Sequence, residues 1–169
     1  MTLFESQLAT YASYHRDPRN RATHFVGIPA IVFSVFLPLA LLRVPIGGFD
    51  LSAAWIVAAL AAAGWIALDR SIGLAMVVML LPMVLVAEWI ARTYGPAAAW
   101  WTFTIFFIGG WVFQLVGHSA FEGRRPALLD NLFQAFIGPM FIMAEVLMML
   151  GLRRDLAHLI ETPPAERVA

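Results

Sequence analysis

Long apolar runs, separated by short polar breaks, dominate this chain. Four runs cover residues 25–44, 51–68, 72–89 and 97–117, and each approaches the roughly 20 residues with which an α-helix crosses a bilayer. A further run, residues 132–152, is less uniform because polar and helix-bending residues interrupt it. The pattern predicts an all-α, polytopic integral membrane protein with about four to five transmembrane helices.

The N-terminal segment has a different pattern, with apolar side chains spaced as on one face of a helix. These side chains are Leu3, Phe4, Leu8, Tyr11 and Tyr14. Residues 1–17 are therefore predicted to hold an amphipathic helix that lies at the membrane surface. Asp17 and Pro18 then favour a new helix start, because Asp is a good N-cap and Pro suits the first helical position.

The breaks between the runs have the composition of turns. They fall at residues 44–50, 69–71 and 92–96. The last apolar run has two interpretations: it spans the bilayer, or it breaks at Gly138 and Pro139 and returns to the side that it left. We favour the re-entrant interpretation, because it keeps Arg153 and Arg154 on the cytoplasmic side.

Composition supports a membrane protein. The chain is 61% hydrophobic and 13% charged, with a mean hydropathy of +0.78, whereas soluble domains are roughly half apolar and a quarter charged. The formal net charge is zero, so nothing suggests a nucleic-acid partner. The absence of cysteine excludes disulfides, zinc–thiolate sites and iron–sulfur clusters. We expect one membrane-embedded domain over residues 1–169, with a flexible tail at 155–169.

Arginines supply all the basic side chains and flank the runs unequally. One side would carry Arg16, Arg19, Arg21, Arg70, Arg124 and Arg125, and the other Arg43 and Arg92. The positive-inside rule places the richer side, and with it the N-terminus, in the cytoplasm. We expect a bacterial inner-membrane protein (endoplasmic reticulum if eukaryotic) whose active site faces the cytoplasm.

The most informative polar residues lie at the end of the fourth run and before the first. Gln114, His118 and Glu122 follow one another at four-residue intervals, which predicts a single helical stripe. Such a stripe beside an apolar span needs polar partners. Four crossings return His118 to the membrane face at which His24 begins the first run, and the break between the N-terminal helices lets His15 turn towards both.

These residues leave several functions open. Imidazoles beside a carboxylate suit iron, zinc or copper, and Asn20, one turn before His24, could orient an imidazole or contact a substrate. The functions left open include a His-ligated zinc lipid hydrolase, a b-type haem protein and a non-enzymatic transporter or scaffold. His158 is expected to be a solvated residue of the tail.

Two motifs in these segments resemble a known family. They are His15-x4-Asn20-x3-His24-x2-Gly27-x-Pro29 and Gln114-x2-Gly117-His118-x3-Glu122-x3-Pro126-Ala127. The chain resembles the membrane Fe(II)-dependent 2-hydroxy fatty acid dioxygenases of α-oxidation, whose fungal member acts in phytosphingosine breakdown in the endoplasmic reticulum. The arrangement of apolar runs is also similar, so the resemblance covers most of the chain.

The resemblance implies that His15, His24 and His118 hold Fe(2+) and are catalytic. Glu122 would be a fourth ligand or the acceptor that fixes an imidazole. The remaining site predictions are Asn20, Gln114, Arg124 and Arg125 for substrate binding, and Tyr14, Asn20 and Glu145 as supports behind the ligands. The partners would be a 2-hydroxy fatty acid, O2 and membrane lipid, and the products CO2 and a fatty acid one carbon shorter.

Overall fold

The computed structural model describes residues 1–160, and residues 161–169 lie outside the described part. The chain forms two compact units. The first comprises Met1–Val26 together with the chain from Phe113 onward, and the second is Gly27–Val112. Helices make up most of both units, which confirms the predicted all-α class.

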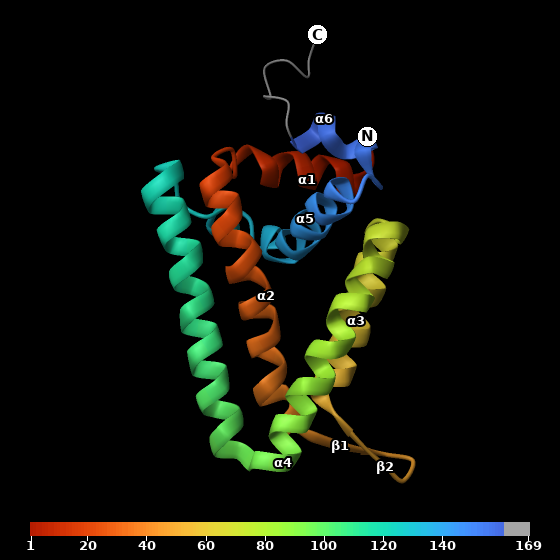
Figure 1. Ribbon diagram of the computed structural model, residues 1–169. Helices are drawn as coiled ribbons and strands as arrows, with labels where there is room; N and C mark the ends of the chain where they lie inside the picture. Colours follow the sequence, from red (N-terminus) through yellow and green to blue (C-terminus); the bar gives the residue numbers. More distant parts are fainter. Residues whose placement is uncertain (161–169) are drawn as a thin grey trace. The chain divides into compact units, whose positions relative to one another are not determined.

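The first unit is built from short helices and helix ends. It contains α1 (Leu3–Ser13), the first turns of α2 (Pro18–Leu41), the last turn of α4 (Arg70–Gly117), the π-helical turn η1 (His118–Glu122), the 3-10 turn η2 (Ala127–Leu129), α5 (Phe133–Met149), the 3-10 turn η3 (Arg154–Leu156) and α6 (Ala157–Ile160). α1 packs against both α5 and α6 (Figure 1). The core that they share is mainly apolar, with Phe4, Leu8, Phe141 and Leu156 buried.

The predicted N-terminal amphipathic helix is confirmed as α1. A capping box starts it: Glu5 N–H donates to the Thr2 hydroxyl at 3.2 Å, and Thr2 N–H donates to the Glu5 carboxylate at 2.7 Å. Its apolar face, with Phe4, Leu8 and Tyr11, is covered by α5 and α6. The predicted start of the next helix is also confirmed, since α2 begins at Pro18.

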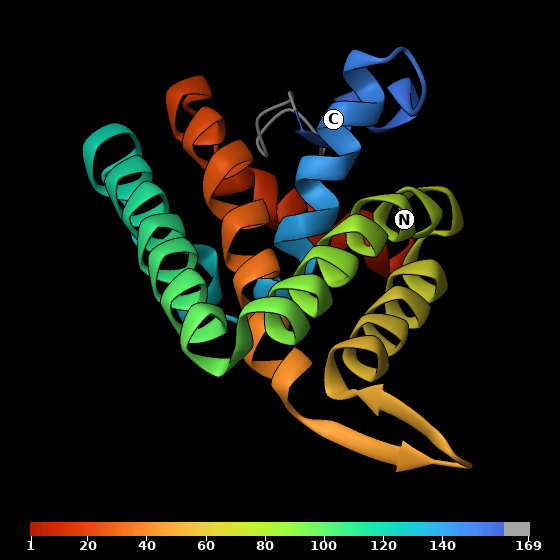
Figure 2. The same ribbon diagram turned by 60° about the horizontal axis from the view of Figure 1, so that its bottom comes forward.

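The second unit contains the rest of α2, a two-stranded hairpin, α3 (Ala53–Leu68) and most of α4. The hairpin pairs β1 (Arg43–Ile46) with β2 (Phe49–Ser52) in antiparallel register, and Figure 2 shows it clearly. We predicted only a turn at residues 44–50. Gly47 and Gly48, at φ 55° and 86°, form the reversal, because glycine adopts positive φ without steric cost.

Two of the predicted breaks differ in kind. Asp69 separates α3 from α4, and its carboxylate accepts the N–H groups of Ser71 and Ile72 at 3.0 Å each, so it caps α4. At the other break, α4 is interrupted by the single residue Gly95, with φ 77° and ψ −175°. α4 therefore consists of two arms that correspond to the third and fourth predicted spans.

Two stretches are long and apolar enough to cross a membrane, Pro18–Leu41 and Arg70–Glu122, among the residues described. The pair α5 and α6, bent by 117°, would add a third as a broken span or re-entrant segment. α3 is apolar but has only 16 residues.

The end of the chain corrects two details of the sequence analysis. α5 continues through Gly138 and Pro139 as one helix, so the predicted break there is wrong. The chain turns instead after Met149, where Gly151 adopts φ 80°. The predicted tail is partly folded, because residues 155–160 belong to η3 and α6 and bury Leu156; its remainder, residues 161–169, lies outside the described residues.

Candidate metal centre

Three histidines from distant parts of the sequence meet inside the first unit. His15 lies in the link between α1 and α2, His24 in the second turn of α2, and His118 at the start of η1. Their exposed fractions are 2%, 1% and 2%. The rings meet edge to face, with centroids 4.4 Å apart for His15 and His24, 4.8 Å for His15 and His118, and 4.9 Å for His24 and His118.

Backbone carbonyl groups fix two of the rings. His15 Nδ1 lies 2.7 Å from the Tyr11 carbonyl oxygen, and His24 Nδ1 lies 2.8 Å from that of Asn20. A carbonyl oxygen only accepts, so both Nδ1 atoms must carry their protons. In the neutral imidazoles the two Nε2 atoms are then acceptors, and these atoms face each other at 3.0 Å.

Two facing lone pairs repel unless a cation lies between them. Protonating one ring would supply that cation, but burial, reinforced by His24, holds the pKa of His15 well below its usual range. The third histidine offers another free acceptor or donor, since His118 Nδ1 is buried with no hydrogen-bond partner among residues 1–160. A bound metal ion would resolve both features.

The donor set fits a transition metal. One nitrogen from each histidine lies within 4.8 Å of the other two. Among the described residues, these three histidines form the group of side chains that could hold a metal ion. Imidazole suits zinc, copper, iron and nickel, and typical metal–nitrogen distances are about 2.0–2.1 Å, which two nitrogens 3.0 Å apart can satisfy together. The carbonyl bonds to Nδ1 are the kind that orient metal-binding imidazoles.

Close packing of α2 on the last turn of α4 brings His118 to the other two histidines. A Cβ atom on Gly117 would collide with Asn20 Oδ1 and Thr23 Oγ1, so glycine is required for this approach. After Gly117 the helix widens into the π-helical turn η1, which ends at Gly123 with φ 61°. The predicted α-helical stripe from Gln114 through His118 to Glu122 is therefore wrong beyond His118.

Glu122 lies near the histidines but is engaged by the start of α2. Its Oε1 accepts the backbone N–H of Asp17 at 2.7 Å and the side-chain N–H of Asn20 at 3.2 Å. It is outside the three-histidine group. Glu122 thus ties η1 to the residues that position His24, as expected of a support rather than of a ligand.

Two further predicted site residues have buried atoms without partners. Asn20 Oδ1 and Gln114 Nε2 make no hydrogen bond within residues 1–160, although the two residues are 0% and 6% exposed. Unpaired buried polar atoms are costly, so they mark places where a ligand or water is needed.

The other predicted residues form two groups outside the three-histidine cluster. Tyr14 OH donates to Asp130 at 2.9 Å, which raises the pKa of Tyr14, and Arg125 pairs with the same carboxylate at 2.9 Å. Arg124 stacks on the Tyr14 ring, with 4.4 Å from Cζ to the centroid.

His158 is exposed, as predicted, and its Nδ1 lies 2.6 Å from the Asp155 carbonyl oxygen.

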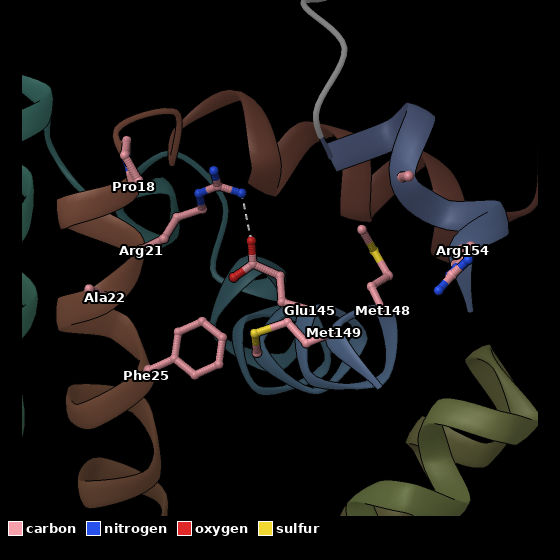
Figure 3. A pocket seen from close by; sticks show the side chains of 9 residues that line it. Pro18, Arg21, Ala22, Phe25, Glu145, Met148, Met149 and Arg154 are labelled. Carbon is pink, nitrogen blue, oxygen red and sulfur yellow. Dashed lines mark hydrogen bonds and ion pairs between the residues drawn. The ribbon is translucent and has the colours of Figure 1, made fainter. Parts of the chain in front are cut away.

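Glu145 forms the second group with Arg21, at 2.7 Å (Figure 3). Sequence reasoning missed Arg21, although its position three residues before His24 places it near that ring. It also missed Tyr11, whose ring stacks on His15 with centroids 4.1 Å apart, and Phe141, 5.8 Å from His15. Helical spacing from His15 points to Tyr11, but nothing in the local sequence points to Phe141.

The comparisons with known proteins concern nearly the whole chain. Residues 1–150 match the family described as 2-hydroxy-palmitic acid dioxygenase Mpo1-like. The chain is 34% identical over 163 residues to the 2-hydroxy-palmitic acid dioxygenase MPO1 of Saccharomyces cerevisiae, an alignment that covers 92% of this chain and 88% of the yeast protein. No solved structure matches the chain. The family match includes all three histidines of the cluster.

Proposed function

Because this chain belongs to the 2-hydroxy-palmitic acid dioxygenase Mpo1-like family, we propose that it is an Fe(2+)-dependent dioxygenase of 2-hydroxy fatty acids. The observation that carries the proposal is the convergence of His15, His24 and His118, with the Nε2 atoms of the first two facing each other at 3.0 Å. Bound iron would supply the redox chemistry that activates O2.

The overall reaction breaks the bond between C1 and C2. A 2-hydroxy acid and O2 give CO2, water and the fatty acid one carbon shorter, and atoms and electrons balance without a further reductant. The apolar helices suit a substrate that is dissolved in the membrane. We propose the cytoplasmic face for the site, on the arginine distribution, and a bacterial inner membrane for the protein, or the endoplasmic reticulum in a eukaryote.

The protein's own residues have distinct roles in this proposal. Tyr11 and Asn20 hold the imidazoles of His15 and His24 through their carbonyl oxygens. Glu122 holds the Asn20 side chain and the start of α2. Gln114 Nε2 and Asn20 Oδ1, buried and without partners in the described residues, are available to hydrogen-bond a polar substrate head.

The test begins with protein purified anaerobically and analysed for metals. We expect about one iron per chain, and release of pentadecanoic acid and CO2 only when both 2-hydroxyhexadecanoic acid and O2 are present. Zinc in place of iron, with lipid hydrolysis that does not require O2, would identify the zinc hydrolase instead. A Soret band in the purified protein would identify a haem protein.

A further inference from the structure

A cavity of about 760 Å3 lies in the first unit, between α2, α5 and the α6 region (Figure 3). Its walls are mainly apolar and include Ala22, Phe25, Met148 and Met149. Two arginines, Arg21 and Arg154, are the basic residues of the lining. The volume falls within the roughly 300–1,000 Å3 of typical small-molecule sites.

The cavity adjoins the histidine cluster along two helices. On α2, the lining residues Pro18, Arg21, Ala22 and Phe25 form one stripe, and His24 lies one turn after Arg21 on the neighbouring stripe. On α5, the lining residue Glu145 lies one turn after Phe141, whose ring is 5.8 Å from that of His15. The Arg21–Glu145 pair therefore marks the end of the cavity that is nearer to the rings.

The charge of the lining favours an anion. Arg21 uses Nη1 to pair with Glu145, which leaves the rest of its guanidinium fork for other acceptors. Arg154 is exposed and forms no ion pair within residues 1–160. The lining contains two guanidinium groups, those of Arg21 and Arg154, and one carboxylate, that of Glu145, so its net charge is positive.

An apolar wall with an arginine at the inner end is complementary to a long-chain carboxylate. We propose that this cavity holds the acyl chain of a fatty acid, with its carboxylate at Arg21 and its C2 end towards His24. The inference rests on the proposed function and refines it: Arg21 then binds the carboxylate, whereas the sequence analysis predicts substrate binding by Arg124 and Arg125. Exposed Met149 and Arg154 place the far end of the chain at the protein surface.

Binding of hexadecanoic acid, which lacks the 2-hydroxyl group, tests the inference without turnover. In detergent-purified protein we expect Arg21→Gln to weaken its binding about 10- to 100-fold, the factor that a charge-assisted hydrogen bond is worth, and to leave hexadecanol binding unchanged. Arg19→Gln is the matched control, since Arg19 lies on the same helix and pairs with Asp17 instead. The double variant Arg21→Gln/Glu145→Gln must weaken hexadecanoate binding as well. In this variant Glu145 is not left as an unpaired carboxylate, so the loss cannot be assigned to a stranded buried charge.

Chain-length selectivity tests the apolar wall. Met148→Trp adds bulk inside the cavity, so it should abolish turnover of 2-hydroxyhexadecanoic acid and retain that of 2-hydroxyoctanoic acid. Equal turnover of both acids in this variant would overturn the assignment, as would parental hexadecanoate binding in Arg21→Gln.

Loss of hexadecanoate binding in Arg124→Gln or Arg125→Gln, but not in Arg21→Gln, would place the carboxylate at that arginine instead. Competition by a lysophospholipid but not by hexadecanoate would show that the cavity binds a phospholipid rather than a fatty acid. Arg21-dependent hexadecanoate binding in a protein that converts no 2-hydroxy acid would refute the proposed function and keep this inference.

Discussion

Each unit buries a polar cluster, and the members of these two clusters have different charge relations. The histidine cluster of the first unit (His15, His24 and His118) joins three groups of the same kind. The Glu88 cluster of the second unit joins opposite charges: Glu88 Oε2 accepts from Arg43 Nη2 and Arg92 Nε, both at 3.0 Å, and Asp50 lies 3.9 Å from Arg43.

The two clusters differ in whether their members compensate one another's charges. In the Glu88 cluster, side chains of opposite charge pair with one another and join the hairpin to α4, although Glu88 Oε1 and Arg43 Nη1 have no hydrogen-bond partner within residues 1–160. In the histidine cluster, Nε2 faces Nε2, and only something from outside the chain can make that arrangement favourable. Burial alone does not distinguish the two, since His118 is 2% and Glu88 is 7% exposed.

The largest expected effect is the loss of metal on removing a histidine. His15→Ala, His24→Ala and His118→Ala should each yield folded, membrane-inserted protein without bound iron and without activity, because each removes one donor of three. Elemental analysis and oxygen consumption measure the two losses. His158→Ala is the control and should behave like the parent; full iron content in any of the three variants would remove that histidine from the ligand set.

The Glu88 cluster should respond in the opposite way. Glu88→Gln leaves Arg43 and Arg92 without their shared carboxylate, so unfolding should become easier by an amount at the lower end of about 3–5 kcal/mol, since both arginines are partly exposed. Iron content per folded chain should not change.

Denaturant unfolding in detergent measures this change. Asp50→Asn is the control: Asp50 is 59% exposed at 3.8–3.9 Å from the two arginines, and its loss should cost no more than about 1 kcal/mol. If Glu88→Gln released the metal from folded protein, the separation of the two clusters into structural and functional would be wrong.

Glu122 tests the border of the histidine cluster. Glu122→Gln keeps the shape of the side chain but weakens its bonds to Asp17 and Asn20, so we expect the dissociation constant for iron to rise about 10- to 100-fold. Metal titration of the metal-free protein measures the constant. Complete loss of binding would instead make Glu122 a ligand, the alternative that the sequence left open.

The sequence was sufficient for the helices and for the convergence of the histidines. Apolar runs of about 20 residues allow little but helices in a membrane, and counting crossings predicts that His24 and His118 share a face. The Pro18 break, read from local helix-start preferences, placed His15 correctly beside them.

What the sequence could not predict depends on contacts between distant segments. The partner of Glu145 is Arg21, 124 positions away, and no local pattern names it. The π-helical turn that begins at His118 directly follows Gly117, which packs against the distant residues Asn20 and Thr23, and no local pattern predicts that contact. The break predicted at Gly138 and Pro139 is wrong because local helix-breaking preferences were outweighed by packing. α5 is buried among its neighbours at this point and continues as one helix.

Gly117 provides the smallest and most specific test of the comparison. Gly117→Ala adds one methyl group where the Asn20 and Thr23 side chains already lie, so α2 and α4 must separate slightly or those side chains must move, at a cost of about 1–3 kcal/mol. Because the backbone carbonyl oxygen of Asn20 also accepts a hydrogen bond from His24 Nδ1, part of that cost should appear as weaker iron binding. Gly109→Ala is the matched control on the same helix, since a Cβ there meets nothing within 4 Å. Metal titration and thermal unfolding of both variants decide the outcome: equal iron affinity in the two would show that the close approach at Gly117 serves packing alone.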